Sequence, residues 1–239
     1  MVTVMPRTLF PLFLLALMNL SLTSPIPLHA WDLESSRLVR TSLPAGSRPT
    51  PVQMDADLDG NGAPEHLVLT SGHLKITTAD KVVWQSPEEW NVVQAEFTDL
   101  NRDGAMEATL LVWRPFHPWP VDQWLPHGGR IAGFHDADGY SCQIILVGWG
   151  DGQYREKWAG SALVDPVTSF AVADLDQDGT QELVTLENEY ADPRSAPARD
   201  LIIWKWNGFG FTIVSKINGT FSKMALVQAN DGRTLILVP

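Results

Sequence analysis

Three short segments of the chain carry acidic side chains at the spacing of a cation site. Each has Asp or Asn at its first, third and fifth positions, Gly at the sixth and Glu at the ninth. Side chains at positions one, three and five converge on one point, and the glycine gives the backbone freedom for a sharp bend. The candidate ligands are Asp57, Asp59, Asn61 and Glu65; Asp99, Asn101, Asp103 and Glu107; and Asp174, Asp176, Asp178 and Glu182.

Calcium is the cation that this spacing favours, because it takes many oxygen ligands in flexible geometry. The carbonyl oxygen at position seven, from Ala63, Ala105 or Thr180, is a further expected ligand. Carboxylates this close repel one another, and a bound hard cation is the simplest compensation. Magnesium ranks second, and three polar turns without an ion are the remaining alternative. The sequence therefore predicts up to three calcium ions, with no catalytic residue and no other cofactor.

The elements around these loops are predicted to be strands. Apolar or alternating runs enter the loops at residues 50–55, 92–97 and 170–173, and further apolar runs leave them at 66–69, 108–112 and 183–186. Each unit is therefore expected to be a hairpin with an acidic turn. Strand flanks, and a closing Glu at position nine rather than twelve, distinguish these loops from the helical calcium-binding hand.

Further hairpins follow the acidic ones. Turn residues separate apolar runs at 71–72, 150–152 and 207–208, and Asn207-Gly208 is a strong two-residue turn signal. A fourth, degenerate unit covers residues 225–238, with Asn230-Asp231-Gly232 as its turn. Its first two ligand positions are missing, so we expect no metal there.

The three loops resemble the FG-GAP or VCBS repeat, the blade-forming unit of the integrin α-subunit head and of many exported bacterial proteins. The resemblance covers most of residues 50–239, and its specificity lies in the nine-residue loops. It implies a four-stranded antiparallel blade for each unit, calcium in the hairpin between the first two strands, and several blades around an axis.

The predicted fold class is therefore all-β, a β-propeller-like array of about four blades. The loop glycines at 62, 104, 179 and 232 are 42, 75 and 53 residues apart, near the ~40–45 residues of a propeller blade plus insertions. The last blade has room for only two strands of its own. We expect the N-terminal strand Arg37–Thr41 to complete it; otherwise the array is open and its sheet edges need cover.

The N-terminal segment has the order of a secretory signal. Arg7 precedes an apolar stretch at 9–22 that Pro11 and Asn19 interrupt, and small residues follow up to Ala30. We expect residues 1–30 to be a signal peptide, with an uncertain cleavage point, and residues 31–239 to form the propeller domain. An uncleaved membrane anchor is the alternative. The expected location is secreted, periplasmic or at the cell surface.

Charge and cysteine usage exclude several classes of partner and site. The formal net charge of −11 repels phosphate backbones, so nucleic-acid binding is not expected. Cys142 is the one cysteine, which excludes an internal disulfide and a thiolate metal site. Its apolar surroundings predict a buried core residue rather than a nucleophile.

The segment 114–140 is predicted to be an insertion that builds a binding surface, since it is rich in Pro, His and Trp. Trp90, Trp119 and Trp124 lie in expected loops, where exposed rings stack on sugars. The favoured function is thus a non-catalytic, calcium-stabilised module that binds a protein or glycan. The alternative is a secreted polysaccharide lyase or hydrolase, with an acid/base group among His117, His127 and His135.

Overall fold

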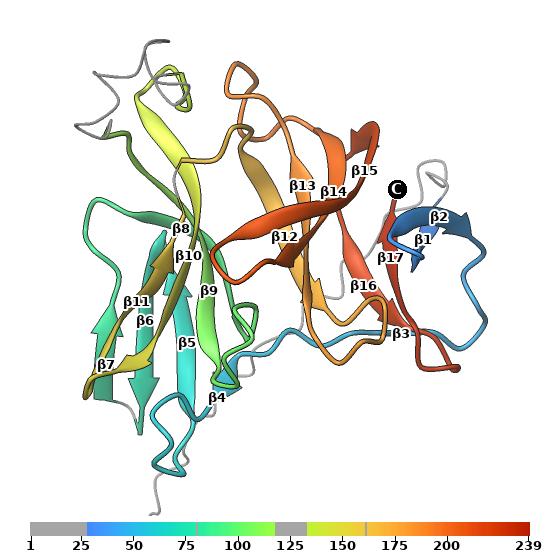
Figure 1. The fold of residues 1–239 in the computed structure, drawn as a ribbon. Helices are drawn as coiled ribbons and strands as arrows, with labels where there is room; N and C mark the ends of the chain where they lie inside the picture. Colours follow the sequence, from blue (N-terminus) through green and yellow to red (C-terminus); the bar gives the residue numbers. More distant parts are fainter. Residues whose placement is uncertain (1–27, 80, 118–132, 161) are drawn as a thin grey trace, which may run out of the picture.

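Antiparallel sheet forms the whole regular structure of the part of the chain that is described. The computed structural model describes residues 28–239 apart from 80, 118–132 and 161. Within these ranges there is no helix, and hence no helical segment able to cross a bilayer. The strands form four antiparallel sheets arranged as a four-bladed β-propeller (Figure 1). The predicted fold class is confirmed.

The first three blades each contain four consecutive strands that pair in chain order. Blade 1 consists of β4 (Asp55–Ala56), β5 (Glu65–Thr70), β6 (His73–Thr78) and β7 (Lys81–Gln85). Blade 2 consists of β8 (Asn91–Thr98), β9 (Glu107–Pro115), β10 (Tyr140–Gly150) and β11 (Gln153–Ala159). Blade 3 consists of β12 (Val167–Ala173), β13 (Glu182–Glu187), β14 (Ala198–Trp206) and β15 (Phe211–Phe221).

Blade 4 combines the two ends of the chain. Its five strands are β16 (Ala225–Gln228), β17 (Thr234–Val238), β1 (His29–Glu34), β2 (Arg37–Thr41) and β3 (Arg48–Pro49). The sheet order is β2-β1-β17-β16-β3, so the predicted strand Arg37–Thr41 does complete the last blade. The sequence did not indicate β1, which forms the direct contact with β17.

Strand β1 begins before the expected end of the signal peptide. His29 and Ala30 pair with Val238 and Leu237, and Ala30 is buried. Cleavage after Ala30 would remove both residues from the blade, whereas cleavage ahead of His29 would leave the strand complete. Residues 1–27 of the predicted signal segment lie outside the described residues.

The inner strand of blade 1 is much shorter than predicted. The run 50–55 was expected to be a strand, but only Asp55 and Ala56 pair with β5. Pro51 has no N–H to donate, which favours an irregular path here. The segment instead connects blades, because the Thr50 N–H donates to the Leu226 carbonyl of blade 4 and the Gln53 carbonyl accepts the Phe97 N–H of blade 2.

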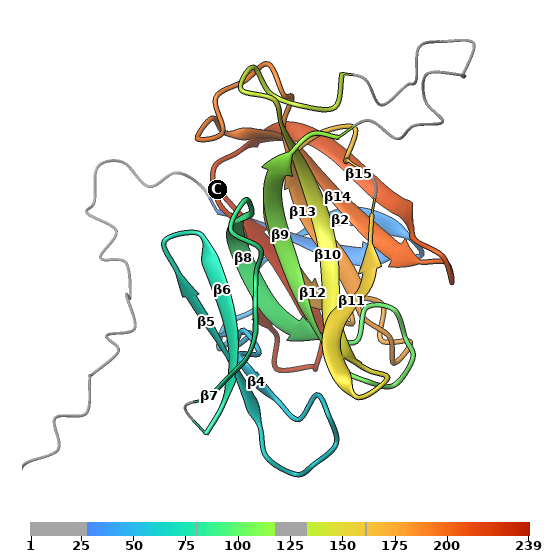
Figure 2. The ribbon, with the colours of Figure 1, turned by 90° about the vertical axis from the view of Figure 1, so that its left-hand side faces the viewer.

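Hydrophobic clusters join successive blades. One cluster packs blade 1 against blade 2, a second packs blade 2 against blade 3, and a third packs blade 3 against blade 4. Figure 2 shows blade 2 between its two neighbours. At the inner strands, the Gln94 side chain of β8 exchanges hydrogen bonds with the Phe170 backbone of β12, at 2.6 and 3.1 Å. These contacts fix the position of each blade relative to its neighbour.

Two sequence expectations about individual core residues have different outcomes. Cys142 is fully buried on β10, as predicted, and burial raises the pKa of its thiol to about 12. Trp90 was expected in an exposed loop, but its side chain is buried in the cluster between blades 1 and 2. The ring therefore has no face free to stack on a sugar. Trp119 and Trp124 lie outside the described residues.

Candidate metal centres

The three acidic loops occupy the same place in three blades, between the first and second strands. Loop 1 (residues 57–65) lies between β4 and β5, loop 2 (99–107) between β8 and β9, and loop 3 (174–182) between β12 and β13. The degenerate turn at 229–233 lies between β16 and β17 (Figure 1). The predicted hairpins are therefore confirmed.

The loops share an unusual backbone. Position six has φ of 87°, 83° and 85° at Gly62, Gly104 and Gly179, a left-handed conformation that glycine adopts without strain. Position four is also left-handed, at Gly60, Arg102 and Gln177. These two positions reverse the chain within each loop, and so bring the acidic side chains to one side.

Backbone N–H groups hold the carboxylate at position one in each loop. The N–H of the position-six glycine donates to Asp57, Asp99 and Asp174 in turn, at 2.9, 3.2 and 3.0 Å. The N–H groups of Ala63, Ala105 and Thr180 donate to the side chain at position five, at 2.7, 2.9 and 2.9 Å. The proposed ligand role of the carbonyl oxygens at position seven stays a prediction.

The carboxylates converge as the spacing predicts. In each loop, one oxygen from each of three acidic residues lies within 4.8 Å of the others. The converging groups are Asp57, Asp59 and Glu65; Asp99, Asp103 and Glu107; and Asp174, Asp176 and Glu182. All three clusters have the donor chemistry to hold a hard cation.

The side chains at the remaining ligand positions mostly form hydrogen bonds within their own loops. Asn61 donates to Asp59 at 2.8 Å, and Asn101 donates to Glu107 at 2.9 Å. Asp178 accepts the Thr180 N–H at 2.9 Å and contacts Lys205. A cation that uses these three residues would share them with the hydrogen bonds of the turn.

Loop 2 has buried oxygen atoms that no described group satisfies. Glu107 is 1% exposed, and its Oε2 has no hydrogen-bond partner. Asp99 Oδ1 is likewise buried without a partner. Burial, together with the nearby Asp103 and Asp99 carboxylates, raises the pKa of Glu107 to about 7. A cation at this point would supply the missing partner for both oxygens, so the residues present fit a metal ion.

Loop 1 is completed by a tyrosine of the next blade. Tyr154, on β11 of blade 2, directs its hydroxyl at Glu65 Oε1 (2.9 Å) and Asp59 Oδ2 (3.2 Å). Burial and these carboxylates raise the pKa of the tyrosine hydroxyl well above its usual value. The other Glu65 oxygen accepts the Leu58 N–H at 2.7 Å. Loop 1 thus meets a neutral donor, which offsets little of its charge.

Loop 3 meets a cationic side chain. Lys205, on β14 of the same blade, has its Nζ 2.9 Å from Asp176 Oδ2 and 3.1 Å from Glu182 Oε1, and also contacts Asp178. Burial lowers the pKa of Lys205, but its hydrogen bonds to the acidic groups outweigh this and raise it. The sequence interpretation missed Lys205. Aligning the third strand of each repeat would have revealed it, because β6 and β10 carry no lysine at that position.

The degenerate turn also carries a cation of its own. Arg233 pairs with Asp231 at 2.8 Å and contacts the buried Asp32 of β1. Positions one and three of this turn are occupied by Val227 and Ala229, which pack into an apolar cluster.

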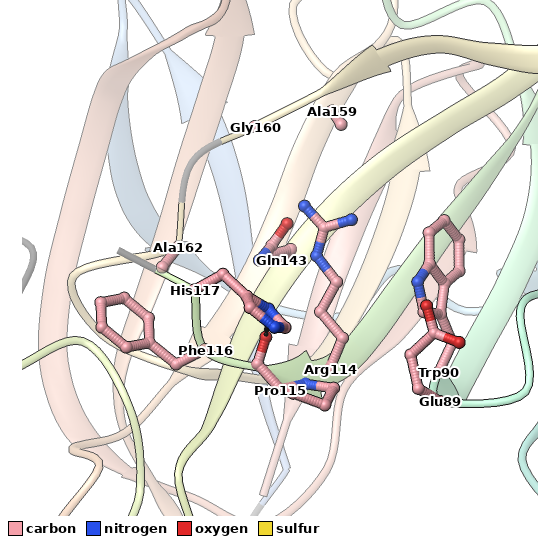
Figure 3. Close-up of a pocket in the computed structure, with 10 residues that line it drawn as sticks. All are labelled: Glu89, Trp90, Arg114, Pro115, Phe116, His117, Gln143, Ala159, Gly160 and Ala162. Atoms are coloured by element: carbon pink, nitrogen blue, oxygen red, sulfur yellow. Dashed lines mark hydrogen bonds between the residues drawn. The ribbon is translucent and has the colours of Figure 1, made fainter. Parts of the chain in front are cut away.

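A pocket of about 380 Å³ lies at the opposite end of blade 2 from loop 2, because β9 runs from Glu107 to Pro115. Figure 3 shows Arg114, Gln143 and His117 around it. Gln143 is 5% exposed, and its Oε1 has no described partner. Arg114 is 5.6 Å from the Trp90 ring centroid, and burial lowers its pKa.

Among the described residues, no hydrogen bond or ring contact joins the histidines expected to serve an acid/base role. His117 contacts the Pro115 carbonyl at 3.0 Å, and His135 packs against Phe116 with ring centroids 5.1 Å apart. Asp136, near His135, is paired with Arg194, and this hydrogen bond with Arg194 holds the pKa of the carboxyl below its usual value despite burial. His127 lies outside the described residues.

Comparisons with known proteins add little to this geometry. No family model matches the chain, and no curated protein matches it. Among solved structures, it is similar to a chain in the crystal structure of BBS1N in complex with ARL6DN, soaked with mercury, at 10% identity and a TM-score of 0.27. The match covers 79% of this chain and 65% of that one. The class of protein is therefore defined by its own sheets, as a four-bladed β-propeller.

Proposed function

We propose that this chain is an exported, calcium-stabilised β-propeller module of the FG-GAP or VCBS type, which binds a protein or glycan and catalyses no reaction. The observation that carries the calcium proposal is loop 2. Two of its carboxylate oxygens, from Asp99 and Glu107, are buried without a partner. Leaving such groups unpaired costs several kcal/mol, and a doubly charged ion with oxygen preference removes that cost.

The role of the ion in this proposal is structural. Each loop joins the inner strand of a blade to the next strand, so neutralising its carboxylates stabilises the hairpin. Export is supported by the pattern of the N-terminal sequence. The burial of Cys142 also suits an oxidising compartment, because no reactive thiol is exposed on the described surface.

Calcium binding is testable by titration calorimetry on chelator-treated protein. We expect calcium to bind at least about tenfold more tightly than magnesium, since the loops offer many flexible oxygen ligands. The double variant Asp99→Asn, Glu107→Gln should lose the heat of one site. Glu96→Gln is the matched control: Glu96 is also a buried carboxylate of blade 2 with an unpartnered oxygen, but it lies outside the loops. Equal heats for the two variants would contradict a site in loop 2.

The pocket beside Arg114 is where we place the ligand. The guanidinium of Arg114 feels the charges of Glu156 and of Glu89, which also lines the pocket, and Gln143 offers a carbonyl oxygen without a described partner. An anionic group bearing a hydroxyl would satisfy both, as in an acidic sugar. Neutral sugars lack the charge that Arg114 would pair with.

An array of neutral and acidic oligosaccharides tests the placement. We expect binding of acidic members, weakened at least about tenfold in Arg114→Gln because a charge-assisted hydrogen bond is lost. Arg155→Gln is the control, since Arg155 pairs with Asp151 in an exposed turn of the same blade. Binding that is unchanged in Arg114→Gln would contradict this ligand site.

A further inference from the structure

The three acidic loops differ in what faces them from the third strand of their blade. The strand register, continued by one residue, places Thr78 of β6 opposite Glu65, Gly148 of β10 opposite Glu107, and Lys205 of β14 opposite Glu182. The same structural position therefore holds a hydroxyl, no side chain and an ammonium group. The three loops therefore have the same backbone conformation but face side chains of different charge.

Lys205 supplies loop 3 with the positive charge that a cation would bring. Its ammonium group donates hydrogen bonds to Asp176 and Asp178, and lies 3.1 Å from Glu182 Oε1, an ion-pair contact to a buried oxygen that accepts no hydrogen bond. The side chain of Glu182 is fully buried and that of Lys205 is 24% exposed, so water screens the contact between them only in part. An incoming ion would have to separate the lysine from all three partners.

Loop 2 lacks such a group because of Gly148. A Cβ at this position would lie 2.9 Å from Glu107 Cγ, so the loop is packed closely over the glycine. Lys157, the nearest basic side chain, has its Nζ 4.0 Å from Asp103 Oδ2 and donates to the Trp149 carbonyl at 3.3 Å. It approaches the rim of the cluster and leaves the buried Glu107 oxygen unpaired.

Loop 1 is also without a cation of its own. Its carboxylates meet the Tyr154 hydroxyl, and no basic side chain of the described residues forms an ion pair with Asp57, Asp59 or Glu65. In blade 4, by contrast, Arg233 pairs with Asp231 and Asp32. Blade 1 thus has no described basic side chain paired with its loop, and blade 2 has only Lys157 at the rim, whereas blades 3 and 4 place a basic side chain directly against their carboxylates.

We propose that Lys205 takes the place of the metal ion in loop 3, so that the protein binds two calcium ions, in loops 1 and 2, rather than three. This inference rests on the calcium binding proposed above and concerns its stoichiometry. Calcium binds loop 3 at least about a hundredfold more weakly than the other loops, because it must displace an ammonium group held by several charge-assisted hydrogen bonds. Loop 3 is nonetheless a competent site once the lysine is gone.

Native mass spectrometry of the full chain in calcium-containing buffer tests the proposal. We expect two ions in the wild type, three in Lys205→Met and two in Lys216→Met. Lys216 is the matched control, because it pairs with Asp200 at 2.9 Å away from the loops. Adding Asp176→Asn and Asp178→Asn to Lys205→Met should restore a count of two. Three ions in the wild type, or two in a cooperatively melting Lys205→Met, would overturn the proposal.

Hydrogen exchange on the wild type gives a second readout that does not depend on a variant. We expect calcium at 100 times its Kd to slow exchange by about a hundredfold in residues 57–65 and 99–107, and to leave 174–182 unchanged. Protection of 174–182 equal to that of the others overturns the role of Lys205. No bound ion and no protection in any loop instead overturns calcium binding itself, so the two failures are distinguishable.

Discussion

Removing calcium should lower the melting temperature by about 10–20 °C. An ion that binds only the folded chain stabilises it by about 2.7 kcal/mol when its free concentration is 100 times Kd. Two such ions contribute about 5 kcal/mol, and each kcal/mol corresponds to about 2–4 °C in a domain of this size. Scanning calorimetry with and without a calcium chelator measures the shift.

The charge distribution explains why the effect should be large. Ten of the 28 acidic residues lie at ligand positions of the three loops. Without an ion, the carboxylates of loops 1 and 2 repel one another within each loop. The double variant Asp99→Asn, Glu107→Gln should therefore melt higher than the wild type in chelator, yet gain less from calcium. An unchanged melting curve in chelator, with no metal in the native protein, would contradict the structural role of calcium.

Deleting strands β1 and β2 should abolish the folded state. A chain that starts at residue 43 exposes the edge of β17, with Ile236 and Val238, both fully buried in the intact blade. It also removes Leu33 from the cluster between blades 3 and 4, and leaves Arg233 without Asp32. The loss of one core leucine alone costs about 2–5 kcal/mol, a large share of a domain's total stability.

Circular dichroism and size-exclusion chromatography measure this effect. A chain that starts at residue 28 is the control, because it keeps both strands and should melt as the full chain does. Adding a peptide of residues 28–43 to the shorter chain should restore some folded protein, since a separate strand can pair with an exposed sheet edge. A cooperative melt of the shorter chain at the control temperature would contradict the role of β1 and β2 in completing blade 4.

The turns of the fold were predictable from the sequence, because their chemistry is local. Asp at position one and Gly at position six are needed within the same nine residues, so the loops are visible without knowledge of the fold. The strand Arg37–Thr41 was predictable for a different reason: a blade with two strands of its own requires others. The strand β1 was not, since its first two residues, His29 and Ala30, fall within the predicted signal segment.

Contacts between distant residues could not be predicted in the same way. Tyr154 reaches loop 1 across 89 residues of sequence, and its partner is fixed only by the packing of blade 2 on blade 1. Trp90 is buried for the same reason. Lys205 lies on the third strand of its blade, so only an alignment of the repeats that includes the third strands predicts it. The local pattern thus identifies acidic sites and cannot say which of them already holds a basic side chain.

The pairing of His29 with Val238 has a consequence for the order of folding. Blades 1 to 3 are each built from one continuous segment, so each can form as its residues become available. Blade 4 requires both ends of the chain, and its central pairing spans over two hundred residues of sequence. Such a contact of high sequence separation forms slowly. We therefore expect closure of blade 4 to be a late step of folding, with strands β1 and β2 unpaired from β17 until residues 234–238 are available.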